Sequence, residues 1–233
     1  MNIFFLSMRP KQAARWHANI HIVKMIVETA QLLCNVHHRA ADKDSHCAPP
    51  FVAKSRIPYK ESQAGHRKLG SMIWVAESLG NYRWGVELGL ALCREYNRGR
   101  GRAAGKQSLH RTQAVLEWLR DHEPNFTRVR RTPVRRRHLA MPEKLKDAPN
   151  SVEAYRDYYY SKRRTMPMVW PEGLTPEWWL ARKMAKRQAA KKRSSSPAAA
   201  ASGASGATRK RKSPARGVAA SQPELPILKR RRR

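Results

Sequence analysis

Polar residues recur at helical spacing in the most apolar stretch of the chain, between Trp16 and Leu33. Steps of four, three, four and three residues keep the polar side chains on one face of a helix. They are His17, His21, Lys24, Glu28 and Gln31. The pattern predicts a single helix over about 10–38, with Pro10 in its first turn and one polar stripe along an otherwise apolar surface.

The same periodicity predicts further helices over 72–96, 108–122, 151–164 and 176–193. Ser71 and Ser108 are placed to cap the first two of them. Asn150 and Glu153 have capping-box spacing at the start of the third. A glycine–asparagine pair at 80–81 is expected to break or kink the helix that contains it.

The segments between and after these helices set the expected domain organisation. Residues 2–8 form either a short buried strand or an extended lead-in, and 39–70 form a long loop. Ser, Ala, Gly and Pro dominate the last forty positions, which predicts disorder. We therefore expect an all-α domain over 1–180 built on a buried first helix, a basic extension of the last helix over 181–193, and a disordered basic tail over 194–233.

Positive charge is in excess along the whole chain, with 48 Lys and Arg against 17 Asp and Glu and a formal net charge of +31. From Ala181 onward there are 17 basic residues and one acid, and before it 31 basic and 16 acidic residues. A basic tail alone is explained by solubility or targeting. Because the body is strongly basic as well, we expect a polyanionic partner, with DNA the first candidate.

Three cysteines without framework spacing, Cys34, Cys47 and Cys93, predict free thiols in a reducing compartment. No apolar run is long enough to span a membrane. We therefore expect an intracellular protein without a membrane partner. No cofactor is expected.

The polar stripe is a candidate active site if it faces a cleft. Burial there would lower the pKa of Lys24 and make its amine a nucleophile, with Glu28 as the group that orients it or acts as base. His17 and His21 would handle protons or phosphate, and Gln31 completes the stripe. The alternative is a buried structural network or a solvent-facing strip.

A metal is not expected, although His17 and His21 have the i, i+4 spacing that can bind one. Zinc proteases with this spacing carry Glu directly after the first His, where this chain has Ala18. A metal-dependent nuclease that uses the two histidines is kept as an alternative.

Basic residues interleaved with tyrosines supply the candidate contacts to nucleic acid. Tyr155 and Tyr159 share one helix face with Lys162, which assigns part of this stretch to the core. Trp74, Trp84, Trp178 and Trp179 are also expected in the core. The candidate binding residues are Arg98, Arg100, Arg102, Lys106, Arg130, Arg131, Arg135, Arg136, Arg137, Arg156, Tyr158, Lys162 and Arg163.

Three stretches of the body, up to about Trp179, carry a resemblance. They contain N-I-F-x-L, H-x-x-x-H-x-V-K-M-I-x-E-x-A-Q, W-V-x-E-S-x-x-N-Y-x-W and A-Y-R-x-Y-Y. In these patterns the chain resembles a family of small proteins encoded by tailed phages and large DNA viruses. The resemblance implies a viral protein and no particular reaction.

A fainter resemblance is to the pyrimidine-dimer DNA glycosylases of the endonuclease V type. Those are small basic helical proteins with a catalytic Glu on the first helix and a C-terminal stretch rich in Trp, Tyr and Lys, which "AYRDYYYSKR" resembles. Their nucleophile is an N-terminal amine exposed by removal of Met. Asn2 is too large for efficient removal, so Lys24 is the in-chain candidate.

These observations predict a viral DNA-binding protein that acts as a DNA-repair glycosylase and lyase on damaged bases. The alternatives are a non-catalytic nucleic-acid-binding or packaging protein and the metal-dependent nuclease. The tail tracts "RKRK" and "KRRRR" predict recognition by nuclear import factors and a location in the host nucleus, or in the virion.

Overall fold

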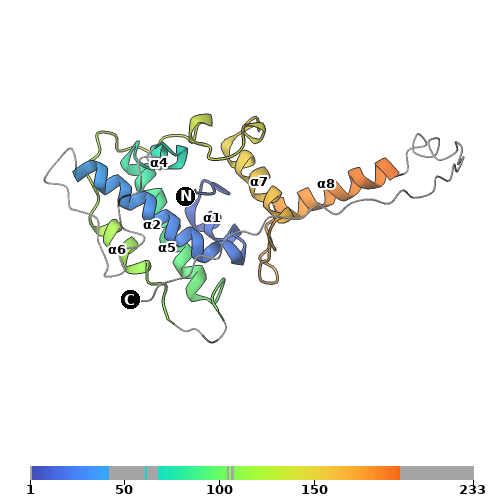
Figure 1. The fold of residues 1–233 in the computed structure, drawn as a ribbon, viewed down its shortest axis with the longest axis horizontal. Helices are drawn as coiled ribbons and strands as arrows, with labels where there is room; N and C mark the ends of the chain where they lie inside the picture. Colours follow the sequence, from blue (N-terminus) through green and yellow to red (C-terminus); the bar gives the residue numbers. More distant parts are fainter. Residues whose placement is uncertain (1, 42–60, 62–67, 104, 106–107, 195–233) are drawn as a thin grey trace, which may run out of the picture. The chain divides into compact units, whose positions relative to one another are not determined.

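In the computed structural model the described residues are 2–41, 61, 68–103, 105 and 108–194, and all their regular elements are helical (Figure 1). The α-helices are α1 Pro10–Trp16, α2 Asn19–Ala41, α4 Gly70–Val75, α5 Leu79–Asn97, α6 Gln113–Asp121, α7 Ser151–Ser161 and α8 Glu177–Ser194. Short 3₁₀ turns are η1 Arg136–His138, η2 Glu143–Leu145 and η3 Lys162–Arg164. The expected all-α class is confirmed.

The chain divides into two compact units, Met1–Gln188 and Ala189–Arg233. Several predictions fall outside the described residues. They concern the tail over 195–233 with its import tracts, Lys106, Cys47 and most of the loop expected over 39–70.

The prediction of a single helix over 10–38 is wrong, because the chain leaves the helical conformation between α1 and α2. His17 is extended, with φ −67° and ψ 137°. Distant groups bind the backbone at this break: Ala18 N donates to Tyr159 Oη at 2.8 Å, and Asn19 N donates to the Val169 carbonyl at 2.8 Å. Because tertiary contacts satisfy these polar groups, the interruption is stable.

The helix expected over 72–96 is also two helices. It breaks just before the Gly-Asn pair, where the side chain of Ser78 accepts a hydrogen bond from Asn81 N and caps α5. Ser71, the expected cap, is buried inside α4. Helix α6 begins at Gln113, so Ser108 does not cap it. At α7 the expected cap is confirmed, because the Asn150 side chain accepts from Glu153 N at 3.0 Å.

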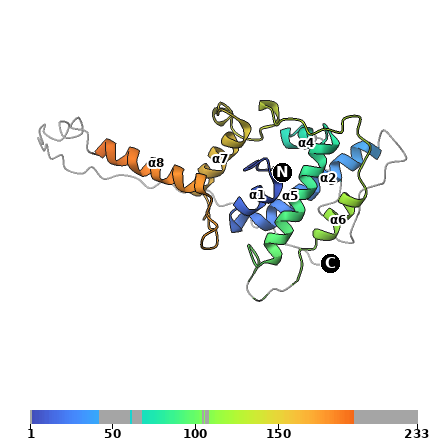
Figure 2. The ribbon, with the colours of Figure 1, turned by 180° about the vertical axis from the view of Figure 1, so that it is seen from behind.

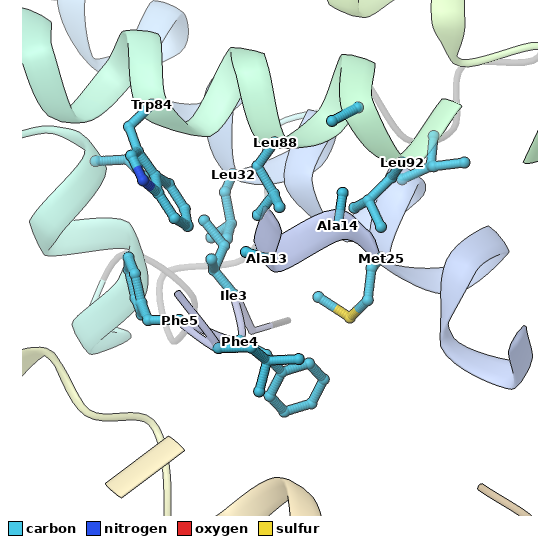
Figure 3. Close-up of a cluster of buried hydrophobic side chains, with 14 of the residues drawn as sticks. Ile3, Phe4, Phe5, Ala13, Ala14, Met25, Leu32, Trp84, Leu88 and Leu92 are labelled. Atoms are coloured by element: carbon cyan, nitrogen blue, oxygen red, sulfur yellow. The ribbon is translucent and has the colours of Figure 1, made fainter. Parts of the chain in front are cut away.

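The core lies where α5 packs along α1 and α2, and the two opposite views show the three helices side by side (Figures 1 and 2). The extended segment 3–6 is buried between them. Phe5 stacks on Trp84 at 4.9 Å between ring centroids, whereas Phe4 points away from Trp84 toward other partners (Figure 3). Of the two predictions for residues 2–8, the structure shows the extended lead-in and not the strand.

Cys34 and Cys93 are free thiols, as expected. Both are buried, and burial raises the pKa of each to about 12, so neither is a reactive thiolate at neutral pH. No helix in the described part of the chain is long and apolar enough to cross a membrane.

Candidate nucleic-acid interface

The predicted polar stripe does not line one open cleft. His17 and His21 are buried, and Gln31 is partly buried. The Lys24 side chain is 69% exposed and the Glu28 side chain 14%. The expected burial of Lys24 is therefore wrong. The stripe divides because the chain breaks before α2. The break takes His17 off the helix, so that the histidine end of the stripe is buried in the core while Lys24 stays exposed on α2.

His17 is a neutral histidine inside the core. Its Nδ1 lies 2.7 Å from the Ala13 carbonyl oxygen, which can only accept, so Nδ1 carries the proton. Its Nε2 is buried and has no hydrogen-bond partner within the described residues. Burial is the largest cause that lowers the pKa of His17 to about 3.

His21 is joined to Tyr159 by a 2.8 Å hydrogen bond at Nδ1. The Tyr159 hydroxyl also accepts a hydrogen bond from Ala18 N at 2.8 Å, so it links the break between α1 and α2 to His21. Burial, followed by the charges of Lys162 and Lys24, lowers the pKa of His21 to about 4. Burial also raises the pKa of Tyr159. The pair is neutral at physiological pH.

Phe4 is the meeting point of two residue sets that were predicted separately. Its ring lies 5.0 Å from Tyr159 and 5.6 Å from His21, centroid to centroid. Lys162 Nζ lies 5.5 Å from the Phe4 ring and 4.4 Å from the Tyr158 ring. The structure thus brings the stripe on α2 next to the aromatic and basic face of α7.

Glu28 accepts a hydrogen bond from Asn2 N at 2.8 Å and lies 3.5 Å from Lys24 Nζ. It therefore holds the N-terminal segment on α2 and pairs with an exposed amine. The histidines fit the structural-network alternative, whereas Lys24 and Glu28 form an accessible amine and carboxylate pair.

The basic loop expected over 128–137 is an anchored segment. Leu79 N donates to the Arg128 carbonyl and Gly80 N to the Val129 carbonyl, each at 2.9 Å. Thr132 N donates to Asn81 Oδ1 at 2.9 Å. A Cβ on Gly80 would lie 2.5 Å from Arg131 N, so this close approach requires glycine.

The arginines of this segment fall into two groups. We call the first group, Arg128, Arg130, Arg131 and Arg135, the arginine segment; its side chains are exposed and make no ion pair within the described residues. Arg131 Nη1 donates to the Met8 carbonyl at 3.1 Å. The second group is paired with acids: Arg136 contacts Glu143 and Asp147, and Arg137 contacts Glu77.

Arg100, which the sequence predicts as a phosphate contact, is buried in the structure, and its side chain is 4% exposed. Its guanidinium donates to Glu95 Oε2 at 2.7 Å, to the Arg15 carbonyl at 3.1 Å, and to the His17 carbonyl. It thus binds the carbonyls at the break between α1 and α2. Arg156 is also structural: it donates to the Leu6 carbonyl and Glu153, and its guanidinium lies 4.9 Å from the Trp16 ring.

The remaining predicted contacts lie at the surface or partly buried. Arg98 is exposed and pairs with Glu95, and Arg102 lies 5.8 Å from the Tyr96 ring. Arg163 lies 4.3 Å from the Tyr160 ring. The four expected core tryptophans and Tyr155 are buried, as predicted.

Sequence reasoning missed a basic surface on α1 and α5, which consists of Arg9, Lys11, Arg15 and Arg94. Lys11 and Arg15 are i, i+4 neighbours, so helical spacing would have indicated their common face. Among the described residues no three His, Cys, Asp or Glu side chains are grouped to hold a metal ion.

Comparison of the chain with protein-family models, curated proteins and solved structures gave no match. The resemblances to a viral family and to the glycosylases therefore stay predictions.

Proposed function

We propose that this protein binds nucleic acid, with DNA as the first candidate, through contacts to phosphate groups. The observation that carries the proposal is the arginine segment. Its backbone is held on α4 and α5 by hydrogen bonds, and its guanidinium groups have no acidic partner within the described residues. An arginine on a fixed backbone loses less freedom on binding, and its planar fork matches phosphate oxygens.

The distribution of ion pairs supports the same proposal. Acids of the body neutralise particular arginines, such as Arg83 through Glu123 and Arg120 through Asp121. The arginine segment is left with its full charge at the surface. Clustered unneutralised cations displace the counterions of a polyanion, which is the main source of sequence-independent affinity.

The double substitution Arg130→Ala/Arg135→Ala in the full chain is expected to weaken DNA binding. The slope of log affinity against log salt should become shallower by roughly 2, because each lost phosphate contact removes about 0.9. The melting temperature should stay unchanged, since both side chains are exposed. Fluorescence anisotropy with a labelled duplex over a salt series measures the slope.

The matched control is Arg83→Ala/Arg120→Ala, which removes the same charge from two exposed arginines that have acidic partners. It should reduce the slope less. An equal slope for both double variants, or no binding of the wild-type chain at low salt, would contradict the proposal.

A second candidate function is base excision with strand nicking, favoured by the exposed Lys24 amine 3.5 Å from the Glu28 carboxylate. In this reaction the unprotonated amine attacks C1′ of the damaged nucleotide, and the bond from C1′ to the base breaks. The base leaves with one proton of the amine. The C1′–O4′ bond of the sugar ring then opens, O4′ takes the second amine proton, and the sugar is held as an imine on Lys24. Loss of a proton from C2′ then expels the 3′ phosphate by β-elimination, which nicks the strand. Borohydride reduces that imine to a stable adduct.

Lys24→Ala is expected to abolish any borohydride-trapped adduct on damaged DNA. It should change stability by less than about 1 kcal/mol, since the Lys24 side chain is 69% exposed and Glu28 keeps its hydrogen bond from Asn2 N. Lys144→Ala is the matched control, because Lys144 is another exposed lysine and belongs to η2 rather than α2. Adducts should be counted on denaturing gels. Wild-type protein that forms no adduct on any damaged DNA would favour the non-catalytic alternative.

A further inference from the structure

Two cavities adjoin along α1. The first, of about 650 Å³, is lined by Met8, Arg9, Trp16 and the segment 173–177 among others. The second, of about 580 Å³, is lined by basic residues of α1 and α5. Arg15 and Leu174 line both cavities, so the two meet at these side chains. We call the combined depression the α1–α5 groove.

The groove is lined by unneutralised positive charge. Arg9, Arg15 and Arg94 are exposed and form no ion pair within the described residues. Lys11 and Arg98 also line the groove and are exposed, but each is paired with an acid, Lys11 with Glu87 at 3.9 Å and Arg98 with Glu95 at 3.0 Å. These charges favour an anionic ligand.

The acids at the groove do not cancel this charge. Glu95 is held by Arg100 at 2.7 Å and by Arg98 at 3.0 Å, so its carboxylate is already matched. Glu177 is exposed at the end of the first cavity.

The arginine segment contacts the chain at one edge of the groove. Arg131 Nη1 donates to the carbonyl of Met8, and Met8 lines the first cavity next to Arg9. A polyanion that is bound to the arginine segment can therefore also contact the exposed cations of α1.

The size and lining of the groove favour a single strand. Cavities of several hundred Å³ admit a small number of nucleotide-sized groups, and a paired duplex presents no unpaired base to such a depression. Trp16 supplies an aromatic surface in the first cavity, with Arg156 contacting its ring at 4.9 Å. A basic groove with an aromatic side chain is the arrangement by which proteins bind single strands without sequence preference.

We infer that the α1–α5 groove is a binding site for single-stranded nucleic acid, in which Arg9, Arg15 and Arg94 contact successive phosphates and Trp16 stacks on a base. The inference rests on the proposed nucleic-acid binding and adds the strandedness of the ligand. The arginine segment then binds a duplex region, and the groove receives the unpaired strand that continues from it.

The test compares Arg15→Ala/Arg94→Ala with Arg130→Ala/Arg135→Ala in the full chain, using a labelled short oligothymidylate and a labelled duplex hairpin. The groove variant should lose roughly tenfold in affinity for oligothymidylate, and its salt slope on that strand should fall by about 1.4. Its affinity for the duplex should change by less than about twofold. Melting temperatures should match wild type, because neither side chain makes an ion pair within the described residues.

An unchanged affinity of the groove variant for oligothymidylate would overturn the inference, as would equal losses on the two ligands. If the wild-type chain binds the duplex through Arg130 and Arg135 but does not bind oligothymidylate, the inference fails and the proposed function stands. Absence of binding to both ligands would overturn both.

Discussion

Replacing Arg100 with alanine is expected to lower the free energy of unfolding by about 3–5 kcal/mol, because the buried carboxylate of Glu95 loses its buried partner and keeps only the exposed Arg98. The loss extends beyond the ion pair. The guanidinium also binds the carbonyls of Arg15 and His17 at the break between α1 and α2. Without these donors the interrupted helix has unsatisfied buried acceptors.

Urea denaturation followed by circular dichroism measures this effect. Arg98→Ala is the matched control, since Arg98 pairs with the same carboxylate but its side chain is 71% exposed, and it should cost less than about 1 kcal/mol. Adding Glu95→Gln to Arg100→Ala should restore part of the loss by removing the buried charge. An Arg100→Ala variant as stable as Arg98→Ala would show that the buried pair does not hold the break.

Lowering the pH from 7 to 5 is expected to destabilise the fold by roughly 4 kcal/mol through His17 and His21. Burial lowers the pKa of His17 to about 3 and of His21 to about 4, against 6.5 for the unfolded chain. Below pH 6.5 the unfolded state therefore binds protons that the folded state does not. Each histidine contributes stability that is fully present above pH 6.5 and falls by about 1.4 kcal/mol per unit as the pH drops.

The variant His21→Asn isolates this effect, because its side-chain amide takes the place of Nδ1 and can hydrogen-bond with the Tyr159 hydroxyl but does not titrate. Between pH 7 and 5 its free energy of unfolding should fall by about 2 kcal/mol less than that of wild type, which is the contribution of one histidine. The lowered pKa values of Glu77 and Glu153 act below this range, since those carboxylates titrate from 4.5 downward. His138, whose pKa burial also lowers, adds a slope of the same sign to both proteins. An identical pH dependence in variant and wild type would contradict the burial of His21.

Local sequence signals were sufficient where a helix is capped by a side chain that is close to it in the sequence. Asn150 caps α7 as its spacing with Glu153 predicts, and the apolar period places Tyr155 and Tyr159 in the core. Hydrophobic composition and period were enough for the all-α class, because an amphipathic pattern states which face of a helix is buried. The apolar period did not mark either break, although the glycine–asparagine pair at 80–81 predicted the interruption before α5.

The charge of the body was likewise evident from composition, but the role of each arginine was not. Arg100 and Arg130 both stand in basic loops of the sequence, yet Arg100 is buried against Glu95 and Arg130 is exposed. Charge density in a sequence does not say which cations are matched by acids from other elements. Ion pairing is therefore decided by the tertiary structure.

The sequence by itself determined the helical class, the apolar faces and the excess of positive charge, since these follow from local spacing and composition. Only the tertiary structure decided where the first helix breaks, that the two histidines are buried and neutral, and that the cations of α1 and α5 share a groove. The physical reason is the distance between the partners: Arg100 binds a carbonyl 83 positions away, and Tyr159 a histidine 138 positions away. Contacts between residues so far apart do not appear in the periodicity of the sequence. They nevertheless satisfy the hydrogen-bonding groups that stabilise the break between α1 and α2 and the buried pair of His21 and Tyr159.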